Sequence, residues 1–123
     1  MCIFCQLLSH KDQYIYENDY VFAIYDNYPV TKGHTLIIPK RHFETIFTAS
    51  DEEIMAIGTA LKVLKNQLDL QFHPDGYNVG INNGIDAGQS VMHLHVHLIP
   101  RYHGDSNHPR GGIRGVIPGK QEY

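Results

Sequence analysis

Three histidines, His93, His95 and His97, alternate with the aliphatic residues Leu94 and Val96. A period of two is typical of a β-strand, in which side chains two residues apart point to the same face. At about 3.3 Å of rise per residue, neighbouring rings would stand roughly 6 to 7 Å apart. Neutral imidazoles can bind a metal, exchange protons or attack an electrophile near pH 7. Three of them on one face therefore indicate a chemical site rather than a solvated strand.

Two kinds of chemistry fit this pattern. In the first, the three rings hold a metal ion, since imidazole is a common zinc ligand. In the second, one imidazole attacks phosphorus and forms a covalent phosphoryl or nucleotidyl intermediate. The histidines by themselves leave both interpretations open.

The loop that leads into the histidines, residues 82–90, favours the phosphorus site. It contains Gly84 and Gly88, which allow the backbone to approach a ligand closely, and its free N–H groups can form a concavity for an anion. Gln89 and Ser90 would be neutral donors for phosphoryl oxygens. A purely hydrolytic zinc site has less need of so many donors.

Two cysteines, Cys2 and Cys5, form a C-x-x-C motif near the N-terminus. In a reducing compartment this spacing is typical of metal ligands or of a redox pair, and two inert thiols are the third possibility. A redox motif of the thioredoxin type would lie between a strand and a helix. This one stands at the start of the sequence, which argues against redox catalysis and leaves both half of a metal site and two inert thiols open.

Four apolar segments read as the strands that position these residues. Residues 20–25 and 34–38 predict a hairpin with a wide loop, because turn-forming residues lie between them. Residues 76–82 predict a third strand, and the histidine strand is expected over residues 91–99. Together with one long helix, these strands predict an α+β fold with a largely antiparallel sheet.

The long helix begins at a capping box formed by Ser50 and Glu53. Behind it, apolar residues recur at helical spacing and predict one face packed on the core. The residues of that stripe are Ile54, Ile57, Leu61, Leu64 and Leu68.

The composition bounds the class of protein. A chain of 123 residues is expected to form a single domain over residues 1–123, and 42% hydrophobic with 19% charged residues is typical of a globular protein. The net charge of −3 argues against general nucleic-acid binding, which needs a basic surface. No apolar run approaches the ~18 residues of a membrane span and no signal peptide is recognisable, so a cytoplasmic protein is expected.

The segment from His93 to Ile99 resembles the His-φ-His-φ-His-φ-φ signature of the histidine triad (HIT) superfamily of nucleotide hydrolases and transferases. Residues 22–30, 33–34, 38–42, 83, 87–90 and 100–101 are also similar in order and spacing. The resemblance covers about residues 1–101, and within the remaining tail, residues 102–123, positions 109–120 are similar to bacterial members. It implies an antiparallel sheet of about five strands with one main helix, and a homodimer in which two sheets join into one.

The resemblance also implies a role for each site residue. His95 would be the nucleophile that attacks the α-phosphorus of a nucleotide, and His97 would donate to the phosphoryl oxygens. Ser90 and Gln89 would stabilise developing charge, with His34 in a supporting role. Asp26 would accept from the ribose hydroxyls, Asn83 would contact the substrate, and the candidates for an apolar slot around the base are Phe4, Leu7, Phe22 and Ile24.

Family members with an N-terminal C-x-x-C bind structural zinc through two cysteines, a later histidine and the first histidine of the triad. Carried over to this sequence, the ligands are Cys2, Cys5, His42 and His93. Such a site is closed and tetrahedral, so the ion would brace the fold rather than react. The three triad histidines would then be unequal, one on zinc, one attacking and one supporting.

The leading expectation for function is hydrolysis of a dinucleoside polyphosphate such as diadenosine tetraphosphate, since Arg110 and Arg114 of the tail could meet a long polyphosphate. A nucleoside phosphoramidase would use the same nucleophile. A nucleotidyl transferase stays possible, although in the uridylyltransferase branch of the superfamily a Gln replaces the last histidine, and His97 is intact here. A nucleotide-binding module without activity would be expected to lack His95.

Overall fold

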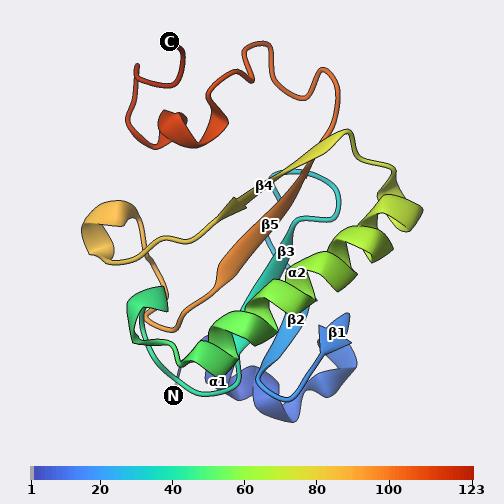
Figure 1. Cartoon of the computed structure of the whole chain (residues 1–123), viewed down its shortest axis with the longest axis vertical. Coiled ribbons are helices and arrows are strands. Elements are labelled where there is room, and N and C mark those ends of the chain that lie inside the picture. The colour runs from blue at the N-terminus through green and yellow to red at the C-terminus, as the bar shows by residue number, and fades with distance from the viewer. Residues whose placement is uncertain (1) are drawn as a thin grey trace.

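The computed structural model describes residues 2–123 and contains one five-stranded antiparallel sheet in the order β1-β2-β3-β5-β4 (Figure 1). This arrangement confirms the predicted α+β fold with one main helix, α2 (Asp51–Phe72). A short helix, α1 (Ile3–Gln6), precedes the sheet, and short 3-10 turns lie between the other elements. The strands are β1 (Tyr16–Glu17), β2 (Val21–Tyr25), β3 (Thr35–Pro39), β4 (Gly76–Gly80) and β5 (Val96–Arg101).

The predicted hairpin is formed by β2 and β3, which pair from Val21 with Pro39 to Tyr25 with Thr35. Its loop turns at Gly33, whose φ of +84° lies in the left-handed region that glycine adopts without strain. On its other side β3 pairs with β5, and β5 pairs in turn with β4. The last triad histidine, His97, is therefore held opposite Leu36 in the middle of the sheet.

The predicted histidine strand over residues 91–99 is wrong in its first half, because β5 begins only at Val96. The β3–β5 ladder stops at the pair of Ile37 with Val96. If the ladder continued in the same register, Pro39 would pair with Leu94. The N–H of Lys40 donates to Tyr20 on the β2 side. Because backbone groups alternate along a strand, the nitrogen of Pro39 then faces β5. Proline has no N–H to give to that rung. Leu94 instead donates to the carbonyl of Phe43 at 2.8 Å.

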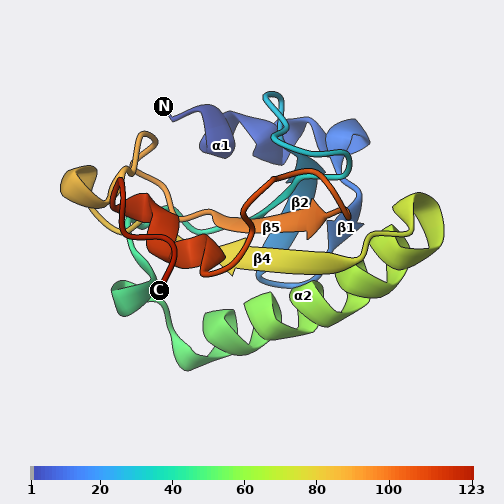
Figure 2. The ribbon, with the colours of Figure 1, turned by 90° about the horizontal axis from the view of Figure 1, so that it is seen from above.

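Helix α2 and the N-terminal segment cover opposite faces of the sheet (Figure 2). Alternation along β2 divides its side chains between these layers, with Val21 and Ala23 in the core under α2 and Phe22 and Ile24 in a smaller core with Phe4 of α1. Leu94, Val96 and Leu98 all lie in the larger core under α2. The histidines between them are consequently turned away from α2.

Helix α2 has the predicted capping box, in which the Ser50 hydroxyl accepts from the Glu53 N–H and the Glu53 carboxylate accepts from the Ser50 N–H. The predicted apolar stripe is wrong at Ile54, which is 47% exposed. The buried face is rotated toward Ala56 and Ala60, which are 8% and 0% exposed. Ile57, Leu64 and Leu68 are buried as predicted.

The C-terminal tail crosses near the outer strand β4 and contains a 3-10 turn, Gly112–Val116. Both tail arginines, Arg110 and Arg114, lie over the ring of Tyr123, at 4.9 and 4.6 Å from its centroid. Within residues 2–123, no helix combines the length and the apolar character needed to span a bilayer.

Candidate functional site

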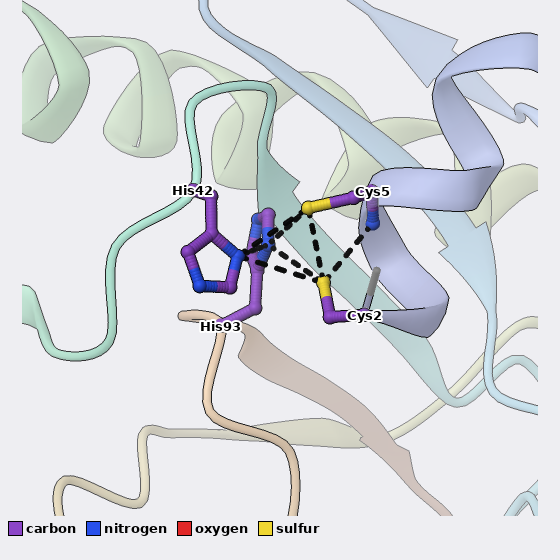
Figure 3. Close-up of side chains that lie close together, drawn as sticks. All are labelled: Cys2, Cys5, His42 and His93. Atoms are coloured by element: carbon purple, nitrogen blue, oxygen red, sulfur yellow. Dashed lines mark hydrogen bonds between the residues drawn. The ribbon is translucent and has the colours of Figure 1, made fainter.

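Two cysteines and two histidines from three separate segments converge on one point (Figure 3). Cys2 and Cys5 lie at the start of α1, His42 follows β3, and His93 precedes β5. The two sulfurs are 3.1 Å apart, the two Nδ1 atoms are 3.1 Å apart, and each sulfur lies 3.3 to 3.6 Å from each Nδ1. The sequence prediction of these four residues as one cluster agrees with this geometry.

The orientation of His93 explains how its ring can serve a metal. Its Nε2 lies 2.8 Å from the carbonyl of Pro39, which can only accept, so the ring proton sits on Nε2 and the Nδ1 lone pair faces the cluster. Burial lowers the pKa of His93, which also favours the neutral, ligating form. In a tetrahedron with Zn–S of about 2.3 Å and Zn–N of about 2.0 Å, the ligand atoms are separated by roughly 3.3 to 3.8 Å. The four sulfur–nitrogen distances lie in this range, whereas the sulfur–sulfur and nitrogen–nitrogen distances of 3.1 Å are shorter. The type and number of these donors suit a zinc ion with four protein ligands and no open position.

The two cysteines have an electrostatic reason to need a cation. The hydrogen bond with Cys2 and then burial raise the pKa of the Cys5 thiol above its usual value. Two adjacent thiolates repel each other, and a divalent ion is the ordinary means of keeping both deprotonated. The N–H of Cys5 donates to the Cys2 sulfur at 3.2 Å, which orients that ligand.

A pocket of about 490 Å³ lies beside this cluster, between α1, the β2–β3 loop and the segment that leads into β5. It gathers most of the predicted reactive residues, namely Asp26, His34, Ser90, His95 and His97. Ser90 is exposed, whereas His34 and His95 are buried at 3% and 7% exposure. The pocket thus has an open side for a ligand and a closed side of imidazoles.

His95 presents a single nitrogen lone pair to this pocket. Its Nδ1 lies 2.9 Å from the carbonyl of His93, so the neutral ring carries its proton there. The lone pair is left on Nε2, the nitrogen that can attack an electrophile. The ring of Phe4 packs against His95 at a centroid distance of 5.1 Å.

A chain of hydrogen bonds sets the protons of His34 and His97. The N–H of Val30 donates to His34 Nδ1 at 3.1 Å, so His34 carries its proton on Nε2. The Nε2–H of His34 donates to His97 Nδ1 at 2.9 Å, which leaves the proton of His97 on its Nε2. His97 therefore offers a donor where His95 offers a lone pair.

Burial keeps both of these rings neutral. It lowers the pKa of His34, and the Asp26 carboxylate opposes this effect only in part. Burial also lowers the pKa of His97, with further contributions from His95 and His34. Asp26 itself lies with one oxygen 3.5 Å from His34 Nε2 and the other accepting from the Tyr28 N–H at 2.8 Å.

The side chains of Gln89 and Asn83 are turned to the backbone and away from the pocket. The Gln89 oxygen accepts from the Gly84 N–H at 2.8 Å, and its amide donates to the carbonyls of Glu44 and Val91 at 2.7 and 3.1 Å. The Asn83 oxygen accepts from the Ile46 N–H at 3.0 Å. A direct donor contact of Gln89 with a substrate, which the sequence predicts, would require its two amide hydrogen bonds to break, and Asn83 does not line the pocket. In this structure the two residues shape the loop.

Three of the four predicted apolar residues, Phe4, Leu7 and Ile24, line the pocket. Phe22 does not, because it is fully buried and stacked on Tyr14 at 4.4 Å. Several further residues line the pocket that were not predicted as site residues, namely Ile3, Gln13, Asn27, Tyr28, Val30, Leu36, Asn82 and Val91. Asn27, Tyr28 and Val30 had a signal in the family resemblance of residues 22–30, and Asn82 had one in its place in the donor-rich loop, although nothing in the local pattern ranks Asn82 above Asn83.

Residues 8–104 match the HIT domain family. The chain is 43% identical over 111 residues to an uncharacterized HIT-like protein, MJ0866, of Methanocaldococcus jannaschii, covering 85% of this chain and 82% of the relative. The chain therefore belongs to the HIT family, as its triad signature predicts, and a nucleotide-processing role is the one this family supports.

Two further relatives bear on the site. A Zn-bound histidine triad family protein from Mycobacterium smegmatis superposes with a TM-score of 0.77 at 34% identity, over 85% of this chain and 78% of that one. The adenylylsulfatase HINT3 of Arabidopsis thaliana is 33% identical over 102 residues, which cover 81% of this chain and 52% of the relative.

Proposed function

We propose that the protein is a nucleotide hydrolase that reacts through a covalent nucleotidyl-histidine on His95. The observation that carries this proposal is the hydrogen bond from His95 Nδ1 to the His93 carbonyl, which leaves the Nε2 lone pair in the pocket. An imidazole of this kind is a nucleophile at neutral pH without prior deprotonation.

In the first step, His95 Nε2 forms a bond to the α-phosphorus while the bond from that phosphorus to the leaving group breaks. The Nε2–H of His97 donates to the non-bridging oxygens, where negative charge increases. The Ser90 hydroxyl donates to the bridging atom of the leaving group. Asp26 accepts from the ribose hydroxyls, and Phe4, Leu7 and Ile24 pack on the base.

In the second step, water attacks the same phosphorus and the N–P bond breaks. The product is a nucleoside monophosphate, the water proton passes to solvent, and His95 returns to its neutral form. The His34–His97 pair holds its donor in place through both steps, because the Val30 N–H fixes the tautomer of His34.

We propose dinucleoside polyphosphates, such as diadenosine tetraphosphate, as the substrate class. Arg110 and Arg114, which favoured this choice at the sequence level, do not line the pocket of the same chain and would reach a polyphosphate only after leaving Tyr123. Nucleoside phosphoramidates and adenylyl sulfate, the latter raised by the name of the HINT3 relative, are the alternatives, with transfer to another acceptor as a third. All of them are attacked at the same α-phosphorus.

The test compares turnover of diadenosine tetraphosphate, adenosine phosphoramidate and adenylyl sulfate by the native protein, His95→Ala and His103→Ala. His103 is an exposed loop histidine outside the pocket and serves as the matched control. We expect His95→Ala to lose roughly 10⁴-fold or more of the turnover, as expected for loss of a nucleophile, and His103→Ala to keep it. Full activity of His95→Ala on its best substrate would show that the nucleophile is wrong.

We further propose that Cys2, Cys5, His42 and His93 hold one structural zinc ion and that two chains associate through β4. Support for the first is the geometry of the cluster. Support for the second is that, within the described chain, β4 pairs on one side only, with β5. Metal analysis and the solution mass of the purified protein test the two proposals separately.

A further inference from the structure

We infer that Phe4 is a positioning residue for His95, so that the cysteine–histidine cluster sets the orientation of the nucleophile. The inference rests on the proposed function, since it concerns the residue proposed to attack. It assigns to the cluster an effect on the pocket in addition to bracing the fold.

The first observation is the packing of Phe4 against two triad histidines. Its ring meets that of His95 edge-on, at 5.1 Å between centroids and 64° between planes, and that of His93 at 5.8 Å and 86°. Edge-to-face contacts of this kind favour a particular ring orientation. Phe4 is only 5% exposed, so it has little room to move away from His95.

The second observation concerns what holds Phe4 in place. It lies in α1, a helix of four residues, and a helix so short has no stability of its own. Cys2 caps this helix through its sulfur, and both Cys2 and Cys5 belong to the cluster. Two things therefore hold Phe4 in place, its packing in the small core and the attachment of the two cysteines to His42 and His93.

The third observation is a separate route from the cluster to His95. His93 contributes its Nδ1 to the cluster, and its main-chain carbonyl accepts the His95 Nδ1–H. The cluster thus contacts the nucleophile twice, through the ring of Phe4 and through the carbonyl of His93. The carbonyl contact is at Nδ1, so it orients the ring without blocking the attacking Nε2.

Phe4 also lines the pocket, so a loss of activity in a Phe4 variant could come from weaker binding of the base. The two effects differ in what they change. Weaker binding raises KM and the Kd for AMP, whereas misorientation of His95 lowers kcat and disturbs the His95 Nδ1–H hydrogen bond in the free protein. The imidazole nitrogen and proton signals in NMR spectra report that bond without any turnover.

The main test is Phe4→Leu with Ile38→Val as its control. Ile38 is fully buried in the same small core as Phe4 but does not line the pocket, so its variant matches the loss of core packing. In Phe4→Leu we expect kcat to fall on the order of 10- to 100-fold, as for a misplaced reacting group, with the bound zinc unchanged. The hydrogen-bonded Nδ1–H signal of His95 should broaden or shift in Phe4→Leu and remain in Ile38→Val.

A second measurement removes zinc from the native protein with a chelator and follows the same His95 signal and the Kd for AMP. We expect the signal to be lost and AMP binding to weaken, with both restored by added zinc. If chelation unfolds the chain, the same signal is followed in His42→Ala, which removes one side chain of the cluster, and Phe4→Leu tests the ring contact because it keeps the metal.

Native kcat and an unchanged His95 signal in Phe4→Leu would overturn the role of Phe4, and an intact signal in folded, zinc-free protein would overturn the role of the cluster. Neither result affects the proposed reaction. Failure of that reaction would appear instead as activity in His95→Ala.

Discussion

The cysteine–histidine cluster and the pocket beside it both contain triad histidines, but the hydrogen bonds of those histidines leave a lone pair free in the cluster and an N–H free in the pocket. In the cluster, the Pro39 carbonyl accepts a hydrogen bond from the Nε2–H of His93, which leaves the Nδ1 lone pair facing the sulfurs. In the pocket, the Val30 N–H starts a chain that gives His97 a proton to donate. His95 lies between the two regions and takes its orientation from a carbonyl of the cluster.

This comparison shows that the partner of the second ring nitrogen, and not the spacing of the triad, decides what each histidine can do. His93, His95 and His97 follow one alternating pattern in the sequence. Three different backbone or side-chain partners then leave a lone pair on Nδ1 of His93, a lone pair on Nε2 of His95 and an N–H on Nε2 of His97. These are the states that the proposed roles of ligand, nucleophile and donor require. Changes to those partners should therefore separate the three roles.

The largest effect should come from removing the sulfurs of the cluster. In Cys2→Ser combined with Cys5→Ser, we expect about one zinc per chain to be lost and the free energy of unfolding to drop by several kcal/mol, on the order of 3 or more, because binding of a structural metal is coupled to folding. Metal analysis and urea unfolding measure the two changes. Zinc retained in the double variant would contradict the assignment of the four ligands.

A smaller effect is expected at the start of the proton chain in the pocket. His34→Ala removes the donor to His97 Nδ1, so His97 can take either tautomer and kcat should fall by about 10- to 100-fold. In His34→Gln the side-chain amide can still donate, and part of the rate should return. Equal rates in the two variants would show that His34 does not act through that hydrogen bond.

Substitution of Asp26, the residue proposed to accept from the ribose hydroxyls, should have a milder effect, mainly on substrate binding. Asp26→Ala removes the carboxylate at the pocket rim and should raise KM about tenfold, which corresponds to one or two hydrogen bonds to a charged acceptor. With the native protein, the KM for a 2′-deoxy substrate should exceed that for the ribose substrate by a similar factor. With Asp26→Ala, removing the 2′-hydroxyl should raise KM little further. If the two changes instead raised KM by independent, multiplicative factors, Asp26 would not be the partner of the ribose.

The smallest effect is the dependence of stability on pH. The pKa values of His34 and His97 are lowered by burial, so the folded chain binds fewer protons there than the unfolded chain. The free energy of unfolding is therefore unaffected by these two histidines above the unfolded pKa of 6.5, and it decreases as the pH falls below that value because the unfolded chain then binds more protons. Urea unfolding of the zinc-loaded protein between pH 7 and 5 should show a decrease that is less steep in His34→Gln. A steeper decrease in that variant would contradict the burial of a neutral His34.

Much of the fold could be predicted from local signals. The capping box of Ser50 and Glu53 and the β2–β3 hairpin follow from short sequence patterns, and the four members of the cluster follow from the family resemblance. The start of β5 could not be predicted, because it depends on which way the nitrogen of Pro39 faces in the sheet. The exposure of Ile54 depends on which face of α2 is turned to the sheet, and that face carries Ala56 and Ala60.

The site was less predictable than the fold for a similar reason. Residue types identified the donors of the loop, but the turn after β4 decides that Asn82 faces the pocket while Asn83 and Gln89 bond to backbone groups. The tautomers of His34 and His97 depend on the Val30 N–H, a main-chain group that no residue type reports.

The most direct test of the central claim is to trap the intermediate. The protein is mixed with diadenosine tetraphosphate, adenosine phosphoramidate or adenylyl sulfate, quenched within the first turnover under conditions that preserve an N–P bond, and analysed by peptide mass spectrometry. We predict an adenylyl group on the peptide that contains His95, located on that residue and missing in His95→Ala. A substrate that turns over with the adenylyl group on another residue, or with no adduct under conditions where its formation outpaces its hydrolysis, would contradict the account.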